Sequence, residues 1–355
     1  MSGPGDHIVR PARYGCSMTL TVADLSESAL LARIFPRLSR STSVLLGPGD
    51  DAAVVAAPDG RTVVSIDTQV QDKDFRLQWP NGYRTTGYDV GFKAAAQNLS
   101  DINAMGAVAT SMVVSLTLPS TTDVAWVEGL AEGLNAAITE LGAEDCSVAG
   151  GDLSGGSEIV VTVAVLGSLE GRDPVLRSGA RPGDVLALAG SAGTAAAGWA
   201  LLEGSTPSSE FTVEMAEAVR LFCRPQPPLA AGPVAARAGA TAMMDVSDGI
   251  LRDAGRIAAA SGVRVDLEPA ALVPFVDKLA PIAAAVGADP LAWVLTGGED
   301  HSLLCTFPDV ASVPAGFAAI GSIMPGGGTL PPVTVGGGEA ARLAVTTVGW
   351  DHFAV

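Results

Sequence analysis

Residues 93–107 read KAAAQNLSDINAMGA, and this stretch decides how the surrounding chain folds. It continues a helical pattern that begins near residue 87, with Val90, Phe92, Ala94 and Ala95 at its apolar positions. The pattern predicts a helix over residues 87–106, and the β-branched alternation after it predicts a strand over residues 111–118. The stretch also carries an aspartate, in the segment NLSD.

Further helices and strands are expected on both sides of this stretch. Helical spacing predicts helices over residues 23–38 (with Thr21 as a possible cap), 124–141, 194–202 and 250–261. Short apolar runs bounded by Gly and Pro predict strands over residues 43–46, 52–56, 62–66, 145–149, 159–166 and 185–188. This order predicts an α/β or α+β fold.

The length of 355 residues predicts two domains. Composition turns polar near Arg172, so we expect a disordered tail over residues 1–18, an N-terminal domain over 19–172 and a C-terminal α/β domain over 173–355. The 48% hydrophobic and 5% aromatic content predicts cores built from Ala, Val and Leu.

The charge balance bears on partners. The 21 basic and 38 acidic residues give a formal charge of −17, which disfavours nucleic acid and anionic lipid as partners. A phosphate-bearing substrate would need local positive charge, and the chain has three lysines, Lys73, Lys93 and Lys278. Divalent cations are therefore expected.

The cysteines and the apolar stretches of the sequence bear on the cellular location of the protein. Cys16, Cys146, Cys223 and Cys305 are widely separated, which argues against a zinc site or a disulfide framework and favours a reducing cytoplasm. Residues 1–17 contain no apolar segment typical of a signal peptide. The uncharged residues 185–202 are rich in Gly, Ala, Ser and Thr, so we do not expect them to span a membrane.

Several common nucleotide and hydrolase motifs are absent from the sequence. It contains no GxxxxGK followed by Ser or Thr, no GxGxxG, no GxSxG and no HExxH. P-loop kinase, Rossmann, α/β-hydrolase and zincin interpretations therefore lose their main support.

Aspartates beside Gly or Ser are the remaining candidates for chemistry. Five places carry them at expected turns, namely Asp50 with Asp51, Asp67, Asp101, Asp152, and Asp245 with Asp248. Magnesium prefers such oxygen ligands and takes one or two carboxylates per ion. Each motif alone is also ordinary for a turn, and Asp248 could cap the helix that begins near residue 250. Their joint occurrence favours a metal-binding role.

Taken together, the motifs resemble a known family. GDDAA, SIDT, KAAAQNLSDINAMGA, GGD, RSGARPGD, DVSDG, TGGED and GWDHF occur in this order, and the set resembles the thiamine-monophosphate kinase family of the aminoimidazole-ribotide synthetase superfamily. The resemblance implies phosphoryl transfer from ATP to thiamine monophosphate. It also implies a homodimer whose N-terminal sheets pair into a barrel, with ATP between the domains.

The resemblance also implies roles for particular residues. Magnesium ligands would be Asp51, Ser65, Asp67, Asp101, Asp152, Asp245 and Asp248, with Ile66 contributing its main-chain carbonyl. Nucleotide contacts would come from Gly151, Asp152, Arg177 and Ser247. Acceptor contacts would come from Glu299 and Trp350, whose ring suits a cationic thiazolium, although Trp350 could equally be a buried anchor.

One departure from the family pattern concerns the acceptor. The segment VQDKDF places Asp74 where the family usually has a histidine that meets the acceptor. Two alternatives therefore stay open: another ATP-dependent synthetase of the superfamily, or a catalytically silent nucleotide-binding protein. No general base is expected, because a phosphate monoester is already ionised near neutral pH.

Overall fold

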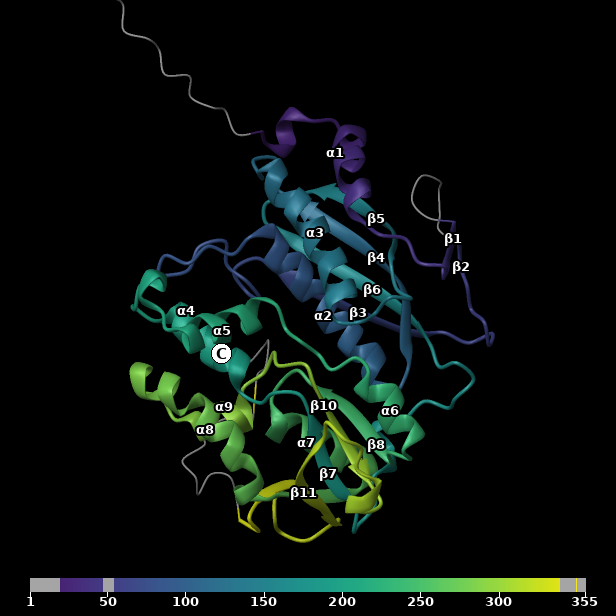
Figure 1. The fold of residues 1–355 in the computed structure, drawn as a ribbon, viewed down its shortest axis with the longest axis vertical. Coiled ribbons are helices and arrows are strands. Elements are labelled where there is room, and N and C mark those ends of the chain that lie inside the picture. The colour runs from purple at the N-terminus through teal and green to yellow at the C-terminus, as the bar shows by residue number, and fades with distance from the viewer. Residues whose placement is uncertain (1–19, 47–53, 339–348, 350–355) are drawn as a thin grey trace, which may run out of the picture.

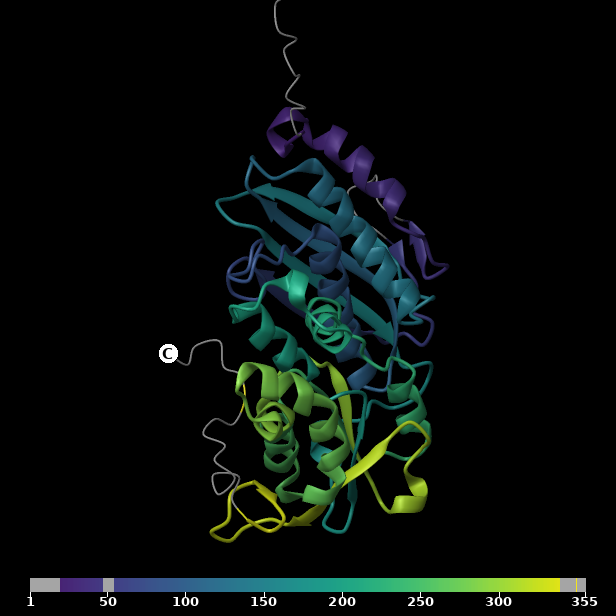
Figure 2. The same cartoon turned by 60° about the vertical axis from the view of Figure 1, so that its left-hand side comes forward.

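The computed structural model describes residues 20–46, 54–338 and 349, and two mixed sheets organise these residues (Figure 1). The first sheet has four strands in the order β3-β6-β4-β5, and the second has six in the order β12-β9-β11-β7-β10-β8. A separate two-stranded pair, β1 with β2, lies near the start of the described chain. Figure 2 shows the two sheets and their helices as successive layers along the long axis.

Three of the four strands in the first sheet are rich in β-branched residues, and the fourth is rich in glycine. Its strands are β3 (Val63–Val70), β4 (Val108–Leu118), β5 (Val148–Gly155) and β6 (Val160–Ser168), and the outer pair is β1 (Val44–Leu46) with β2 (Val54–Val55). Strand β5 runs parallel to β4, and the other pairings in this sheet are antiparallel. As a result β3 and β5 lie at opposite edges.

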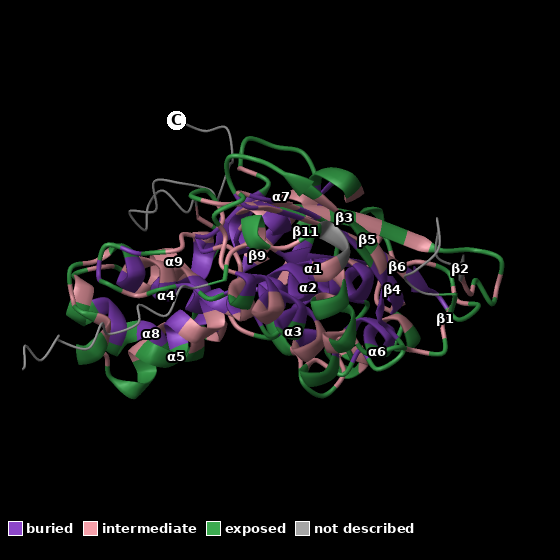
Figure 3. Cartoon of the chain, turned by 90° about the horizontal axis from the view of Figure 1, so that it is seen from above, coloured by how far each residue is buried: buried purple, intermediate pink, exposed green. Residues whose placement is uncertain are grey.

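Two helices, α2 (Gly87–Ala104) and α3 (Val124–Glu140), pack against one face of this sheet, and α1 (Glu27–Ile34) lies outside α3. The opposite face is open in the single chain. Val64 and Ile66 on β3 are 61% and 62% exposed, and Val113 on β4 is 38% exposed. The exposed part of β3 is visible in Figure 3.

The second sheet lies in the other half of the described chain. Its strands are β7 (Val185–Ala189), β8 (Ala242–Val246), β9 (Val263–Leu267), β10 (Ser302–Phe307), β11 (Ala318–Pro325) and β12 (Val333–Val335). Its helices are α4 (Thr194–Glu203), α5 (Val213–Cys223), α6 (Ala231–Arg237), α7 (Ile250–Ser261), α8 (Pro269–Val286) and α9 (Pro290–Thr296). Short 3-10 turns occupy Val22–Asp24, Phe35–Arg37, Arg177–Gly179, Ser208–Glu210 and Val310–Ser312.

The predicted helices over residues 87–106, 124–141 and 250–261 are confirmed to within two residues. The single helix expected over residues 23–38 is wrong. Thr21 caps a 3-10 turn through a reciprocal bond with Asp24, and Ser26 then caps α1 separately. Two caps five residues apart divide the segment.

The expectation that the candidate aspartates lie at turns is also wrong for four of them. Asp67 is inside β3, Asp101 is inside α2, Asp152 is inside β5 and Asp245 is inside β8. GGDLSG forms a strand despite its glycines because it pairs along its whole length with β4. Non-local pairing here overrides the turn preference of Gly and Asp.

Two observations bear on the expected cellular location of the protein. Residues 185–202 form strand β7 and part of helix α4, so they do not form one long apolar helix. By length and composition α8 could cross a membrane; 22% of it is buried, and its Leu272, Leu279 and Ile282 belong to the hydrophobic core around the second sheet. The three cysteines in the described ranges are buried and unpaired, as the sequence predicted.

Glycines let α2 and α3 approach closely. A Cβ atom added at Gly91 would lie 2.0 Å from the Leu130 carbonyl oxygen, and one at Gly133 would lie 2.1 Å from the Tyr88 carbonyl oxygen. Because the obstructing atoms are backbone, neither could move without separating the helices. This packing fixes where α2 lies between the two sheets.

We predict that Gly91→Ala lowers the free energy of unfolding by about 2 kcal/mol or more, because the added methyl group forces the two helices apart. Gly255→Ala is the matched control, since Gly255 is also helical and an added Cβ meets nothing closer than 3.8 Å. Chemical denaturation should show Gly255→Ala stabilised by about 0.5–1 kcal/mol. Equal effects of the two substitutions would contradict the close-packing argument.

Candidate active site

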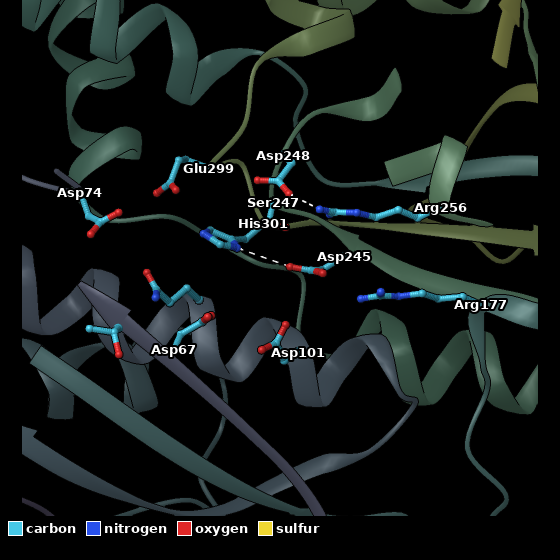
Figure 4. Close-up of a pocket in the computed structure, with 12 residues that line it drawn as sticks. Asp67, Asp74, Asp101, Arg177, Asp245, Ser247, Asp248, Arg256, Glu299 and His301 are labelled. Atoms are coloured by element: carbon cyan, nitrogen blue, oxygen red, sulfur yellow. Dashed lines mark hydrogen bonds and ion pairs between the residues drawn. The ribbon is translucent and has the colours of Figure 1, made fainter. Parts of the chain in front are cut away.

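A polar cavity of about 360 Å³ lies between the two sheets, and its lining is rich in carboxylates. Figure 4 shows side chains from both halves of the chain converging on it. The lining residues are Asp67, Thr68, Asp74, Gln97, Asp101, Arg177, Asp245, Ser247, Asp248, Arg256, Glu299 and His301. Eight of the residues that the sequence analysis selected, Asp67, Asp74, Asp101, Arg177, Asp245, Ser247, Asp248 and Glu299, are therefore brought together.

The two halves contribute opposite walls. Strand β3 supplies Asp67 and helix α2 supplies Gln97 and Asp101 on one side, while the end of β8 supplies Asp245 on the other. Ser65, two residues before Asp67 and on the same face of β3, donates its hydroxyl to Asp101 Oδ2 at 2.5 Å. Ser65 thereby orients a carboxylate at the cavity floor.

Burial and neighbouring carboxylates raise the pKa of two of these carboxyl groups. Burial, reinforced by the charges of Asp245 and Glu299, raises the pKa of Asp67 to about 6. Burial and the charge of Asp245 raise the pKa of Asp101 to about 7, although the Ser65 hydroxyl opposes this shift. Such a site holds its carboxylates ionised at a cost that a bound cation would relieve.

Asp248 is held by arginine. Its Oδ2 lies 2.6 Å from Arg256 Nη2, and Arg256 Nη1 lies 2.6 Å from Oδ1 of the buried Asp253. Asp248 does not cap α7, because Gly249 precedes that helix and no side chain caps it. The capping alternative for Asp248 is therefore wrong, and its carboxylate is available to the cavity.

The segment TGGED enters the site in a constrained conformation. Glu299 and His301 both have positive φ, 69° and 50°. Between them, Asp300 is buried and accepts hydrogen bonds from Ser191 Oγ and the Gly193 N–H, both at 2.7 Å. Asp300 thus anchors this segment to the start of α4, while its two neighbours line the cavity.

A second cavity of about 390 Å³ adjoins the first and shares Asp74 and Glu299 with it. It is lined largely by aromatic and small residues, among them Trp199, Trp293 and Phe222. Asp74 Oδ2 accepts the Val70 N–H at 2.7 Å. One oxygen of the Asp74 carboxylate is therefore engaged by the backbone of its own segment, four residues earlier in the chain.

Gly151 and Asp152 do not line either cavity. Asp67 is aligned across the sheet with Val163, Val114 and Gly151, whereas Asp152 is aligned with Ser115, Thr162 and Thr68. Asp152 therefore lies on the open face, at the edge opposite β3. Ile66 also faces the open side, so its predicted role depends on its main-chain carbonyl. Asp50, Asp51 and Trp350 lie outside the described residues.

Sequence reasoning missed several lining residues. His301 is buried, its Nδ1 lies 3.6 Å from Asp245 Oδ2, and neither ring nitrogen has a hydrogen-bond partner among the described residues. Arg256 and Gln97 face the first cavity, and Trp199 and Trp293 face the second. His301 directly follows TGGED, and Gln97 is one helical turn before Asp101. Their closeness to these motifs could have indicated that both residues belong to the site.

We predict that Asp101→Asn stabilises the metal-free protein at pH 8. The folded pKa of about 7 lies above the unfolded value of about 3.8. The stabilising contribution of this carboxyl is therefore complete below the unfolded pKa and is lost as pH rises through the folded pKa. Removing the charge should raise the free energy of unfolding by about 1–2 kcal/mol at pH 8, discounted for partial exposure.

Measuring the free energy of unfolding in the presence of a chelator at pH 8 and pH 5 checks this prediction. The stability gained by Asp101→Asn over the wild type should be smaller at pH 5 than at pH 8. Asp277→Asn, at an exposed position of α8, is the control and should change stability at neither pH. A destabilised Asp101→Asn protein at pH 8 would contradict the argument from burial and neighbouring carboxylates.

Comparisons with known proteins give the family. Residues 49–169 match the family model "AIR synthase related protein, N-terminal domain", and residues 181–306 match the corresponding C-terminal domain model. Thiamine-monophosphate kinase of Mycobacterium tuberculosis (strain ATCC 25618 / H37Rv) is 46% identical over 333 residues, which cover 94% of this chain and 93% of that protein.

Solved structures agree in fold. The crystal structure of thiamine-monophosphate kinase from Stenotrophomonas maltophilia K279a matches with a TM-score of 0.73 and 30% identity, covering 89% of this chain and 98% of that one. AaThiL complexed with AMPPCP and TMP matches with a TM-score of 0.70 and 27% identity over 96% and 100% of the two chains. The chain, with its two mixed sheets, belongs to the thiamine-monophosphate kinase family.

Proposed function

We propose that this protein transfers the γ-phosphoryl group of ATP to thiamine monophosphate, giving thiamine diphosphate and ADP. The observation that carries the proposal is the pair of adjoining cavities, one lined by carboxylates and arginines and the other by tryptophans, which share Glu299. A polyphosphate suits the first cavity and a cationic aromatic ring suits the second. The relatives named above support this assignment.

The donor set of the first cavity fits magnesium. Its oxygen donors include Asp67, Asp101 and Asp245, and burial together with neighbouring carboxylates raises the pKa values of Asp67 and Asp101. No three His, Cys, Asp or Glu side chains in the described ranges are placed so that they could hold one ion. A magnesium ion here would therefore be held by one or two carboxylates, with waters and phosphate oxygens completing its shell. Magnesium, when bound, would neutralise phosphate oxygens.

The protein's own residues would position the two phosphates. Arg177 and Arg256 point into the first cavity and can donate to phosphate oxygens, and Ser247 can donate its hydroxyl. Trp199 and Trp293 offer ring faces to the thiazolium. No side chain needs to remove a proton, because the acceptor phosphate attacks in its ionised form.

We also propose that a second copy of the chain completes the site. The open sheet face exposes Val64 and Ile66, which a partner sheet would bury. Asp152 lies on this same face, three strands from β3. When two such faces pack together, Asp152 of one copy can approach the β3 edge of the other, where Asp67 lies. The magnesium and nucleotide roles inferred for Asp152 and Gly151 would then be fulfilled across the dimer.

The direct test of function is mass detection of thiamine diphosphate from purified protein, ATP, magnesium and thiamine monophosphate. We expect turnover by the wild type and a loss of about 100-fold or more in Asp67→Asn, because a charge that neutralises the reacting phosphates through the metal is removed. ATP binding without product would identify a silent nucleotide-binding protein. ATP turnover that ignores thiamine monophosphate would identify another synthetase of the superfamily.

The dimer proposal has its own test by complementation. Asp67→Asn and Asp152→Asn should each be inactive, and subunit exchange between them should restore about a quarter of wild-type activity. Half of randomly formed dimers are mixed, and each mixed dimer has one unaltered site if Asp152 acts across the interface. If the exchanged mixture stays inactive although mixed dimers form, Asp152 does not act in the partner's site.

A further inference from the structure

Lys93 is a buried lysine on α2 with three partners. Its side chain is 4% exposed, and its Nζ lies 2.7 Å from Glu299 Oε2. The ammonium also lies over the Phe222 ring, 3.9 Å from the centroid, and donates to the Asp74 carbonyl oxygen at 3.4 Å. Glu299, Phe222 and Asp74 all line the aromatic cavity, so Lys93 lies directly behind its wall.

Glu299 occupies the boundary between the two cavities. Its carboxylate side chain is 32% exposed, its φ is 69°, and its N–H donates to the Ser247 carbonyl oxygen at 2.9 Å. A flexible glutamate side chain at such a position can turn toward either cavity. The contact with Lys93 restricts it to one orientation.

We propose that Lys93 is a positioning residue that fixes the Glu299 carboxylate at the rim of the aromatic cavity, where it favours a cationic acceptor. The inference rests on the proposed function. Lys93 itself does not touch the acceptor, since Glu299 and Phe222 separate it from the cavity. The ammonium group of Lys93 lies against the negative charge of Glu299 and holds this carboxylate where the cationic ring would bind.

A role in stability alone does not account for this arrangement. Buried ion pairs usually contribute little net stability, because desolvation offsets the attraction between the charges. A second cation that contacts α2 gives a comparison. Arg224, whose side chain is 34% exposed, contacts the buried Asp89 at 2.6 Å and lies over the Tyr88 ring, 4.6 Å from its centroid. Asp89 and Tyr88, the partners of Arg224, line neither of the two cavities described above, whereas all three partners of Lys93 line the aromatic one.

The test compares ligand binding by the full-length protein and its variants. Dissociation constants for thiamine monophosphate and for ATP with magnesium are measured by calorimetry in Lys93→Met, Lys93→Arg, Glu299→Gln and the double variant Lys93→Met with Glu299→Gln. Arg224→Met is the matched control. Thermal unfolding of every variant reports whether it is folded, and Lys93→Arg, which keeps the charge, covers the case in which Lys93→Met does not fold.

We expect Lys93→Met to weaken thiamine monophosphate binding at least about tenfold, because Glu299 loses its fixed orientation, while ATP affinity changes less than about twofold. Lys93→Arg should recover most of the loss. The double variant should bind no more weakly than Glu299→Gln alone, because the two residues act as one unit. Arg224→Met should lower thermal stability without changing thiamine monophosphate affinity.

Unchanged thiamine monophosphate affinity in Lys93→Met, equal losses for both ligands, or additive losses in the double variant would each overturn the inference. Wild-type protein that binds thiamine monophosphate without converting it would contradict the proposed function, and the affinity comparison would still decide the role of Lys93. Wild-type protein that does not bind thiamine monophosphate overturns both.

Discussion

The site depends on a polar stripe along one face of α2. Four polar side chains recur every four residues along this helix, and each has a partner. The stripe pairs Asp89 with Arg224, Lys93 with Glu299, Gln97 with Gln69, and Asp101 with Ser65. Residues four apart lie on the same side of a helix, so one rigid element joins the first sheet to the second. The glycine contacts with α3 hold that element in place.

The sequence predicted α2 from its apolar positions but did not predict the stripe. The polar positions carry the same four-residue spacing and could have been read from the same segment. Their partners could not, because Arg224 and Glu299 lie more than 100 residues further along the chain. The family motifs selected Asp67, Asp101 and Asp245, which the structure brings to one cavity. The separate expectation of turns was wrong for four of the candidate aspartates.

Asp67 and Asp152 show why the rest of the site escaped prediction. Both lie in short segments with small and apolar residues, SIDT and GGDL, and nothing local indicates which face of the sheet each side chain takes. Strand order places them at opposite edges of one sheet, and the register places them on opposite faces. A shift of one residue would reverse the faces. Side-chain direction in this sheet is thus set by non-local pairing.

The negative charge of the site explains why lysine and arginine side chains pair with some of its carboxylates. A protein with a formal charge of −17 that gathers Asp67, Asp101, Asp245 and Glu299 around one cavity works against electrostatic repulsion. Fixed cations, Lys93 at Glu299 and Arg256 at Asp248, hold individual carboxylates at the edges. Among the described residues no lysine or arginine pairs with the central Asp67 and Asp101, and burial together with neighbouring carboxylates raises their pKa values. Arginine and lysine therefore occupy the rim, and under the proposed function the centre would be left for cations that arrive with the nucleotide.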